Sequence, residues 1–484
     1  MTHSRLIAAI SLMAACVLGS CAPAVQPAAS PSPVAATVTP TPTAAVNDMI
    51  LGANLGMFED ARIAGAVADI DHARIGHTDS TLVSFGTRHT YSDTTSTTRG
   101  IGAARRWIHA QLSQYSRECN GCLRVEYDTA TMVMPYDTRG PRRITNVLAW
   151  LPGRDTSRVI VMGGHYDSCV CVQTVEGAGL PAGTKYVPRL DSTSTAPGAN
   201  DDGSGSSAVI ELARVFSKRF PQGLGATIVF ALYDAEEQGL VGSTHLAERM
   251  VKGHYDVLAG MTDDIAGNVS AADGFTDSTT MRVFGADPDT SRSRELLRFV
   301  QAAQYTYAPR FTILPVFRLD RVNRGGDHRP FVERGMPGVR FSERVENENR
   351  QHLPGDMLGF VNYPYLANIA RVNAAVIGEL AESPATPDSA RAARISLGTS
   401  GGRRWTFTWK AVPNAASYEI LVRRTYAPQY ERVIPVGNVT RVELDLQLDD
   451  YWAAVRAVGT NGHRSLGAVV PTVTRVIPRA GSTP

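Results

Sequence analysis

The sequence lacks an excess of charge of either sign. Its 484 residues include 48 Lys and Arg against 46 Asp and Glu, which gives a formal net charge of +2. Nucleic-acid-binding proteins usually carry a clustered basic excess, so this balance argues against nucleic acid as a partner. The length predicts two or three domains rather than one.

No hydrophobic run near the N-terminus is long enough to cross a membrane comfortably. The apolar run from Leu6 to Leu18 follows Arg5 and has the length of a signal-peptide core. It ends in Leu18-Gly19-Ser20-Cys21, which resembles the bacterial lipobox, in which the cysteine is acylated. We therefore predict a lipoprotein signal peptide over residues 1–21. The alternative is an ordinary cleaved signal that happens to contain a cysteine.

These N-terminal features predict a location for the protein. Residues 22–46 consist mainly of Pro, Ala, Ser and Thr without periodicity, which is typical of a semi-extended tether. Acyl chains on Cys21 would anchor the protein to a membrane without a transmembrane helix. We therefore expect an exported bacterial lipoprotein that faces the periplasm or the cell exterior.

Cysteine is scarce in the rest of the chain. Only Cys119, Cys122, Cys169 and Cys171 follow the predicted leader. The CxxC and CxC pairs could bind zinc, but export favours disulfides. Three pairings are possible, including local bridges and links between the two pairs, and the sequence does not choose among them.

Short apolar runs and helical periodicities alternate along residues 47–383. Runs such as Val159–Met162 and Thr227–Leu232 are typical of buried strands, and the apolar spacing over Ser206–Phe220 is helical. We also expect helices at Leu296–Ala303 and Tyr365–Leu380, and strands at Met281–Phe284 and Val339–Phe341. This alternation predicts an α/β fold with a mixed, largely parallel sheet sandwiched by helices.

The C-terminal part has a different pattern. Residues 384–394 are interpreted as a linker, and residues 395–484 contain runs of alternating apolar and polar residues separated by turns. This pattern predicts an all-β sandwich. The segment resembles a fibronectin type III domain through Trp409, Ala416-Ser417-Tyr418 and the run from Tyr451 to Ala457. We expect it to be a binding or spacer module.

Acidic residues and histidines recur where the predicted strands end. They lie in GGHYDS (163–168), GANDDGSG (198–205), DAEEQG (234–239), TDDIAGN (262–268) and RQHLPGD (350–356). Each motif alone is more often a solvated turn or a helix cap. Together they supply the imidazoles and carboxylates that two zinc ions sharing a carboxylate need. The adjacent Glu236 and Glu237 allow one to bind metal while the other acts as a general base, which indicates hydrolysis.

The order of these motifs resembles the M28 metallopeptidase family over roughly residues 145–380. The resemblance extends to Gly326-Asp327-His328 and to Gly335-Met336-Pro337. That family includes bacterial zinc aminopeptidases, glutamate carboxypeptidase-like enzymes and glutaminyl cyclases. The resemblance implies a zinc exopeptidase fold of the phosphorylase/hydrolase-like type. It implies no metal role for Asp327 or His328.

The resemblance also implies a role for each site residue. His165 and Asp264 would bind one zinc ion, and Glu237 and His352 would bind the other, with Asp201 bridging both. Glu236 would be the general base, and Asp167 would support His165. Asp263 competes with Asp264, but the following Ile-Ala-Gly-Asn matches the family pattern better from Asp264.

Three functions compete at this point. The first is a two-zinc peptidase. Within this class we favour an aminopeptidase that releases N-terminal residues from peptides. The second is a zinc cyclotransferase of the glutaminyl cyclase type. The third is a non-catalytic binding lipoprotein. The complete ligand set with Glu236 argues against the third, and the bridging arrangement favours the first over the second.

Overall fold

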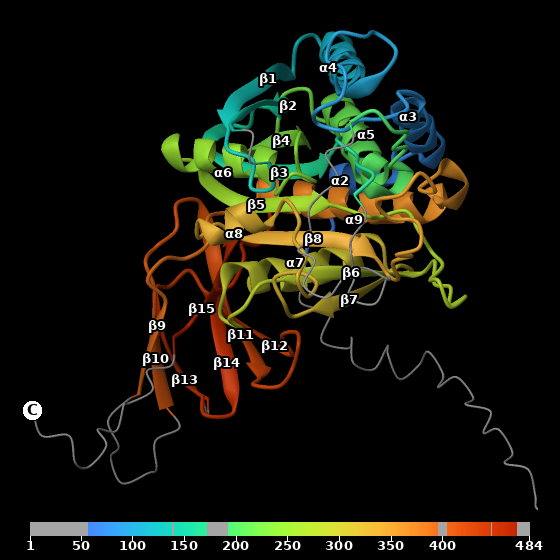
Figure 1. Ribbon diagram of the computed structural model, residues 1–484. Coiled ribbons are helices and arrows are strands. Elements are labelled where there is room, and N and C mark those ends of the chain that lie inside the picture. The colour runs from blue at the N-terminus through green and yellow to red at the C-terminus, as the bar shows by residue number, and fades with distance from the viewer. Residues whose placement is uncertain (1–56, 138–139, 172–191, 395–403, 447, 472–484) are drawn as a thin grey trace, which may run out of the picture. The chain divides into compact units, whose positions relative to one another are not determined.

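The described chain forms an α/β domain followed by a β domain (Figure 1). The computed structural model describes residues 57–137, 140–171, 192–394, 404–446 and 448–471. The helices are α2 (Ala61–Ala68), α3 (His72–Ser84), α4 (Gly100–Glu118), α5 (Gly205–Arg219), α6 (Val241–Lys252), α7 (Arg292–Tyr307), α8 (Arg329–Glu333) and α9 (Tyr363–Glu382). A π-helical turn, η1 (Ala199–Ser204), precedes α5, and a 3-10 turn, η2 (Leu358–Phe360), precedes α9.

An eight-stranded mixed sheet runs through the α/β domain, as predicted. Its strands are β1 (Arg124–Met132), β2 (Arg142–Leu151), β3 (Asp155–His165), β4 (Ala226–Tyr233), β5 (Asp256–Asp263), β6 (Thr280–Gly285), β7 (Thr312–Val316) and β8 (Gly338–Glu343). They lie in the order β1-β2-β4-β3-β5-β8-β6-β7. The four central strands β4, β3, β5 and β8 are parallel, so their carboxyl ends meet at one edge of the sheet.

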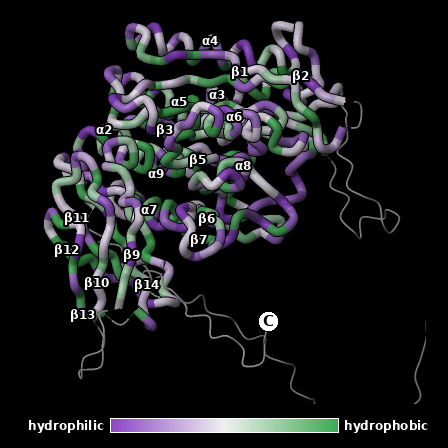
Figure 2. The backbone as a smooth tube through the Cα atoms, turned by 90° about the vertical axis from the view of Figure 1, so that its left-hand side faces the viewer, coloured by the Kyte–Doolittle hydropathy of each residue, from purple (hydrophilic) through white to green (hydrophobic). Residues whose placement is uncertain are grey.

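Helices cover both faces of the sheet, and the side chains of each strand alternate between the two faces. Ile160 and Met162 of β3 pack into the core that includes α5, α7 and α9. Val159 and Val161 of the same strand pack on the opposite face with α6 and with Phe331 of α8. Because both faces are covered, every residue of β4 is buried. The hydrophobic stretches run mainly through the interior in Figure 2.

The predicted elements of this domain are confirmed. The runs at Val159–Met162 and Thr227–Leu232 lie inside β3 and β4, and the helical pattern at Ser206–Phe220 corresponds to α5. The remaining predicted helices and strands correspond to α7, α9, β6 and β8. Helix α9 begins at Tyr363, two residues before the predicted helix, because the Asn362 side chain caps it by accepting a hydrogen bond from the Tyr365 backbone N–H at 3.0 Å.

The β domain has two antiparallel sheets. One has the order β13-β10-β9 and the other β12-β11-β14-β15. The strands are β9 (Arg391–Arg394), β10 (Arg404–Thr408), β11 (Ala415–Arg424), β12 (Arg432–Gly437), β13 (Arg441–Asp445), β14 (Tyr451–Gly459) and β15 (Ala468–Val469). Phe407, Trp409, Tyr418 and Val455 are among the buried residues of its own core. The last four residues of the segment interpreted as a linker form β9, which pairs with β10.

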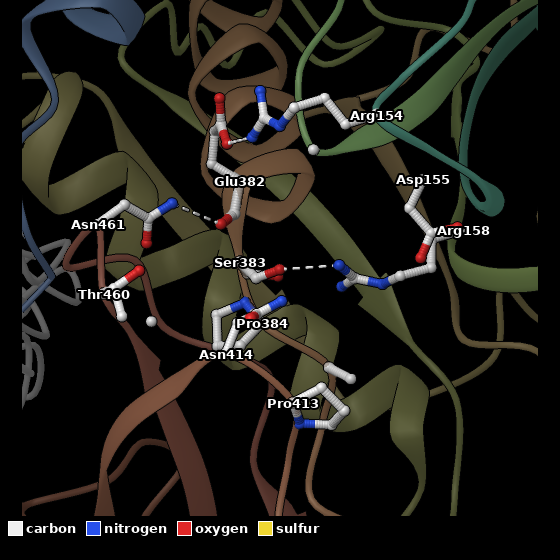
Figure 3. A pocket seen from close by; sticks show the side chains of 13 residues that line it. Arg154, Asp155, Arg158, Glu382, Ser383, Pro384, Pro413, Asn414, Thr460 and Asn461 are labelled. Atoms are coloured by element: carbon white, nitrogen blue, oxygen red, sulfur yellow. Dashed lines mark hydrogen bonds and ion pairs between the residues drawn. The ribbon is translucent and has the colours of Figure 1, made fainter.

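The C-terminal end of α9 and the following Ser383 accept hydrogen bonds from both domains. Asn461 donates to the Glu382 carbonyl at 3.0 Å, and Arg158 donates to the Ser383 carbonyl at 3.0 Å. Figure 3 shows these contacts, together with the ion pair between Arg154 and Glu382. Residues of both domains belong to one compact unit, Met49–Pro484.

The four downstream cysteines form two local disulfides. Cys119 pairs with Cys122 after α4, and Cys169 pairs with Cys171 after β3. Three pairings were possible from the sequence, and the structure contains the one in which both disulfides are local. Cys16 and Cys21 lie outside the described residues.

Candidate metal centre

The predicted site residues follow the carboxyl ends of the parallel strands. His165 is the last residue of β3, Glu236 and Glu237 follow β4, and Asp264 follows β5. Asp201 lies in η1, before α5. Functional residues of such sheets gather beyond the carboxyl ends of the strands. The topology therefore brings together residues that are far apart in the sequence.

Two groups of potential ligands share Asp201. The first consists of His165, Asp201 and Asp264, and the second of Asp201, Glu237 and His352. Within each group, one ligand atom per residue lies within 4.8 Å of the others. These are the five residues that the sequence predicts as ligands.

The two carboxylate oxygens of Asp201 face different histidines. Its Oδ1 lies 3.2 Å from His165 Nε2, and its Oδ2 lies 3.0 Å from His352 Nε2. His352 Nε2 also lies 3.3 Å from Glu237 Oε2, and His165 Nε2 lies 4.0 Å from Asp264 Oδ1. A carboxylate that offers one oxygen to each of two ligand groups has the geometry required of a bridge between two cations.

Asp263 and Asp264 point to different surroundings. The carboxylate of Asp263 accepts hydrogen bonds from the Asn373 side chain of α9 at 2.8 and 2.6 Å. Asp264 instead lies near His165 and forms an ion pair with the fully buried Arg340 at 3.1 Å. The structure therefore places Asp264, the residue preferred from sequence, within the ligand groups.

Asp167 contacts the segment that carries both glutamates. Its Oδ1 accepts the backbone N–H of Glu236 at 3.1 Å, and its Oδ2 accepts that of Glu237 at 3.3 Å. Asp167 also lies beside His165, whose Nδ1 is 3.2 Å from the Asp167 backbone carbonyl and 3.5 Å from its Oδ1. A single buried carboxylate thus orients both the β3 and the β4 sides of the site.

The site holds more buried carboxylates than histidines. Burial, reinforced by Asp264, Asp327 and Glu237, raises the pKa of Glu236 well above its usual value. Burial likewise raises the pKa of Glu237 to about 7 and that of Asp264 to about 6. Burial alone would lower the pKa of His352, but Glu237 and Asp201 outweigh it and raise this pKa to about 9. Bound cations would relieve this crowding of negative charge.

The donor set fits zinc. Zinc accepts imidazole nitrogen and carboxylate oxygen, and all five candidate ligands offer one of these. Glu237 Oε1 is buried and has no hydrogen-bond partner among the described residues, as expected for an oxygen left to a cation.

Two supporting residues were not assigned from sequence. Asp356 accepts the backbone N–H groups of Asn200 and Asp201 at 2.9 and 2.8 Å, and thereby holds the turn that carries the shared carboxylate. Asp202 accepts the backbone N–H of His165 at 3.1 Å. Both lie in motifs that the sequence singles out, but their neighbours belong to other motifs, so the sequence did not indicate these contacts.

Comparison with known proteins identifies the family. The model of peptidase family M28 matches residues 146–377. A probable zinc metalloprotease of Pyrenophora teres f. teres is 34% identical over 436 residues, which cover 84% of this chain and 86% of that protein. A probable zinc metalloprotease of Pyricularia oryzae is 33% identical over 458 residues, 88% of this chain and 87% of that protein. The chain belongs to peptidase family M28.

A solved structure supports the fold of this M28 metallopeptidase. The LapA aminopeptidase of Legionella pneumophila matches with a TM-score of 0.50 and 23% identity, and the match covers 68% of this chain and 76% of that one. The family and its relatives establish a zinc metallopeptidase.

The predicted localisation is wrong. The two relatives described above are fungal proteins, so a bacterial membrane-anchored lipoprotein is not supported. The prediction relied on Leu18-Gly19-Ser20-Cys21. A motif this short, with small residues before a cysteine, also occurs in proteins that are never acylated. Among the described residues, no helix is long and apolar enough to cross a membrane.

Proposed function

We propose that this zinc metallopeptidase is an aminopeptidase with two zinc ions and Glu236 as its general base. The observation that carries the proposal is the shared position of Asp201 between the two ligand groups. His165 and Asp264 would hold one ion, and Glu237 and His352 the other. The name of the LapA structure, an aminopeptidase, agrees with this reaction.

Glu236 lines a groove that also contains the five candidate ligands, except for His165, and a peptide can reach it there. When bound, the zinc ions would supply Lewis acidity that activates water and polarises the peptide carbonyl. The Glu236 carboxylate would accept a proton from the attacking water and then deliver it to the leaving amine. Asp167 accepts the backbone N–H groups of Glu236 and Glu237, so it would hold the proposed base and a proposed ligand in fixed positions relative to each other.

A pair of variants tests the proposed roles. Glu236→Gln removes the base but no ligand, so zinc content should stay at two per chain while turnover of an aminoacyl-nitroanilide falls at least about 100-fold. Asp201→Asn weakens both metal positions, so it should lose zinc as well as activity. Zinc analysis and initial rates measure the two effects separately. Glu333→Gln, at an exposed glutamate of the same groove, is the matched control.

Each outcome bears on one part of the proposal. Unchanged turnover in Glu236→Gln would remove this residue from the mechanism. Two zinc ions retained by Asp201→Asn would refute the bridging role. Incubation with N-terminal glutaminyl peptides tests the cyclotransferase alternative, because cyclisation without hydrolysis would replace the aminopeptidase proposal.

The β domain is proposed to be a fibronectin type III-like spacer or binding module. Its two antiparallel sheets and its separate core, which contains Trp409 and Tyr418, support this assignment.

A further inference from the structure

The groove above the candidate metal centre is lined by three arginines. It has a volume of about 950 Å³, and the site residues among its lining are Asp201, Glu236, Glu237, Asp264 and His352. The other charged residues that line it are Arg321, Arg324, Arg329 and Glu333. Apart from the residues assigned to the metals and the base, the groove wall therefore carries more positive than negative charge.

One buried carboxylate serves three guanidinium groups at this wall. Glu346 Oε2 lies 2.7 Å from Arg324 Nη1 and 3.0 Å from Arg321 Nη1, and its Oε1 lies 2.6 Å from Arg282 Nη2. Burial opposes ionisation of Glu346, but the three arginines outweigh it and lower its pKa to about 2. Glu346 is thus ionised at neutral pH and pairs with three arginines, of which Arg321 also pairs with Asp320.

Arg324 differs from the other two groove arginines in its free donors. Arg321 uses all three guanidinium nitrogens, which donate to Asp320, Glu346 and the Gly325 carbonyl. Arg329 forms an exposed pair with Glu333. Among the described residues, only Glu346 forms a hydrogen bond or ion pair with the guanidinium group of Arg324, through Nη1.

The position of Arg324 suits contact with a bound substrate. Its side chain is 20% exposed, so it is held in place yet reaches the groove. Arg324 lines the same groove as the candidate ligands Glu237 and His352, where a peptide would bind.

We propose that Arg324 binds a carboxylate of the peptide substrate and makes the enzyme prefer substrates that carry one near the scissile bond. This inference rests on the proposed peptidase function. The free Nε and Nη2 donors of Arg324 can form a bidentate pair with a carboxylate, which a neutral amide cannot match. The carboxylate is either the C-terminus of a dipeptide or the side chain of an acidic residue.

Matched acid and amide substrates test the preference. One pair is Leu-Ala and Leu-Ala-amide, and the other is Leu-Glu-amide and Leu-Gln-amide. In at least one pair, the wild-type kcat/KM should be about 10–100 times higher for the acid, the ratio expected for a charge-assisted hydrogen bond. The pair that shows the ratio identifies the source of the carboxylate.

Two variants locate the preference in the groove. Arg324→Gln should reduce the acid-to-amide ratio to near 1, and Glu346 keeps Arg282 and Arg321 as partners, so the fold should survive. Arg329→Gln removes a charge from the same groove and should keep the ratio. Equal rates for acid and amide in the wild type would overturn the proposal, as would an equal loss of the ratio in both variants.

A binding measurement separates this proposal from the proposed function. Calorimetry on zinc-loaded Glu236→Gln should show tighter binding of the acid than of its amide, independent of turnover. If the wild-type enzyme hydrolyses none of the four peptides but the acid still binds more tightly, the proposed aminopeptidase reaction fails and the carboxylate site stands. Equal affinities for acid and amide would overturn the carboxylate site alone.

Discussion

At the scale of single residues, adjacent carboxylates have different roles because their side chains lie in different surroundings. The sequence could place Asp263 and Asp264 near the site and could rank them by a motif. It could not show that Asn373, more than 100 positions away in the sequence, hydrogen-bonds Asp263. The strand ends at this pair, and the two side chains therefore leave the sheet in different directions.

The two carboxylates should separate in a direct comparison. Asp264→Asn removes a proposed ligand, so we expect it to lose at least one zinc ion per chain and most of the activity. Burial raises the pKa of Asp263 to about 8, so this carboxyl is largely protonated at neutral pH. Asp263→Asn should therefore retain both zinc ions and activity within about threefold. Zinc loss from Asp263→Asn alone would reverse the assignment.

At the scale of secondary-structure elements, apolar patterns predicted the buried strands and helices well. Strands β3 and β4 contain apolar, β-branched runs because helices cover both faces of the sheet. Strand β1 has the sequence RVEYDTATM and lies at the sheet edge, so it shows no comparable run. Helix α3 buries polar Thr78 and Asp79, which obscures its apolar face. Neither element was predicted.

The same limit applies to the candidate site. The ligands could be predicted because their motifs lie where the predicted strands end, and the apolar runs that predict the strands also predict those ends. Arg321 and Arg324 of the groove lie in the loop between β7 and α8, and their grouping around Glu346 depends on how that loop packs. No local pattern specifies that packing, so a substrate preference could not be predicted from the sequence.

The loop between β8 and α9 provides a test at this scale. It carries both His352 and Asp356, and Asp356 ties it to the η1 turn through the N–H groups of Asn200 and Asp201. Asp356→Ala should weaken zinc affinity about 10–100-fold, the usual cost of losing a residue that orients a ligand. Competition with a chromophoric chelator measures the affinity.

A matched control distinguishes a local effect from general destabilisation. Asp277 also accepts two backbone N–H groups, those of Thr279 and Thr280, within its own loop. Asp277→Ala should therefore leave zinc affinity unchanged. An Asp356→Ala protein that binds zinc as tightly as the wild type would show that the η1 turn holds its shape without this contact.

At the scale of the whole molecule, the β domain is joined to the α/β domain by buried polar contacts. Tyr430 donates to Glu295 of α7 at 2.9 Å, and Gln429 donates to the Arg298 carbonyl at 2.8 Å. Arg423 pairs with Asp289. The partners in these contacts lie more than 130 residues apart in sequence, so the sequence could predict a linker between two domains but not this interface.

His463 of the β domain lies between two carboxylates of the α/β domain. Its Nδ1 lies 2.8 Å from Glu379 of α9, and its Nε2 lies 3.3 Å from Asp60, the N-cap of α2. The ring of Phe58 packs against it edge-on. Tyr307 of α7 hydrogen-bonds both Glu379 and the Asp60 backbone. Burial alone would lower the pKa of His463, but Glu379 and Asp60 outweigh it and raise this pKa.

The sign of the pH effect follows from that shift. A histidine whose pKa is raised by folding stabilises the folded protein fully below its unfolded pKa of about 6.5, and this contribution is lost as pH rises through the folded pKa. The pKa of Asp60 is lowered, because Arg62 and His463 outweigh the effect of burial, so its contribution is lost only in strong acid. His463→Gln should therefore cost about 1.5–3 kcal/mol of stability near pH 5.5 and much less at alkaline pH.

Urea unfolding at both pH values, with hydrogen exchange of the β14 amides, measures the difference. His72→Gln, at an exposed histidine of α3, is the control and should show no such dependence. An equal cost for His463→Gln at both pH values would mean that His463 contributes packing rather than charge to the interface.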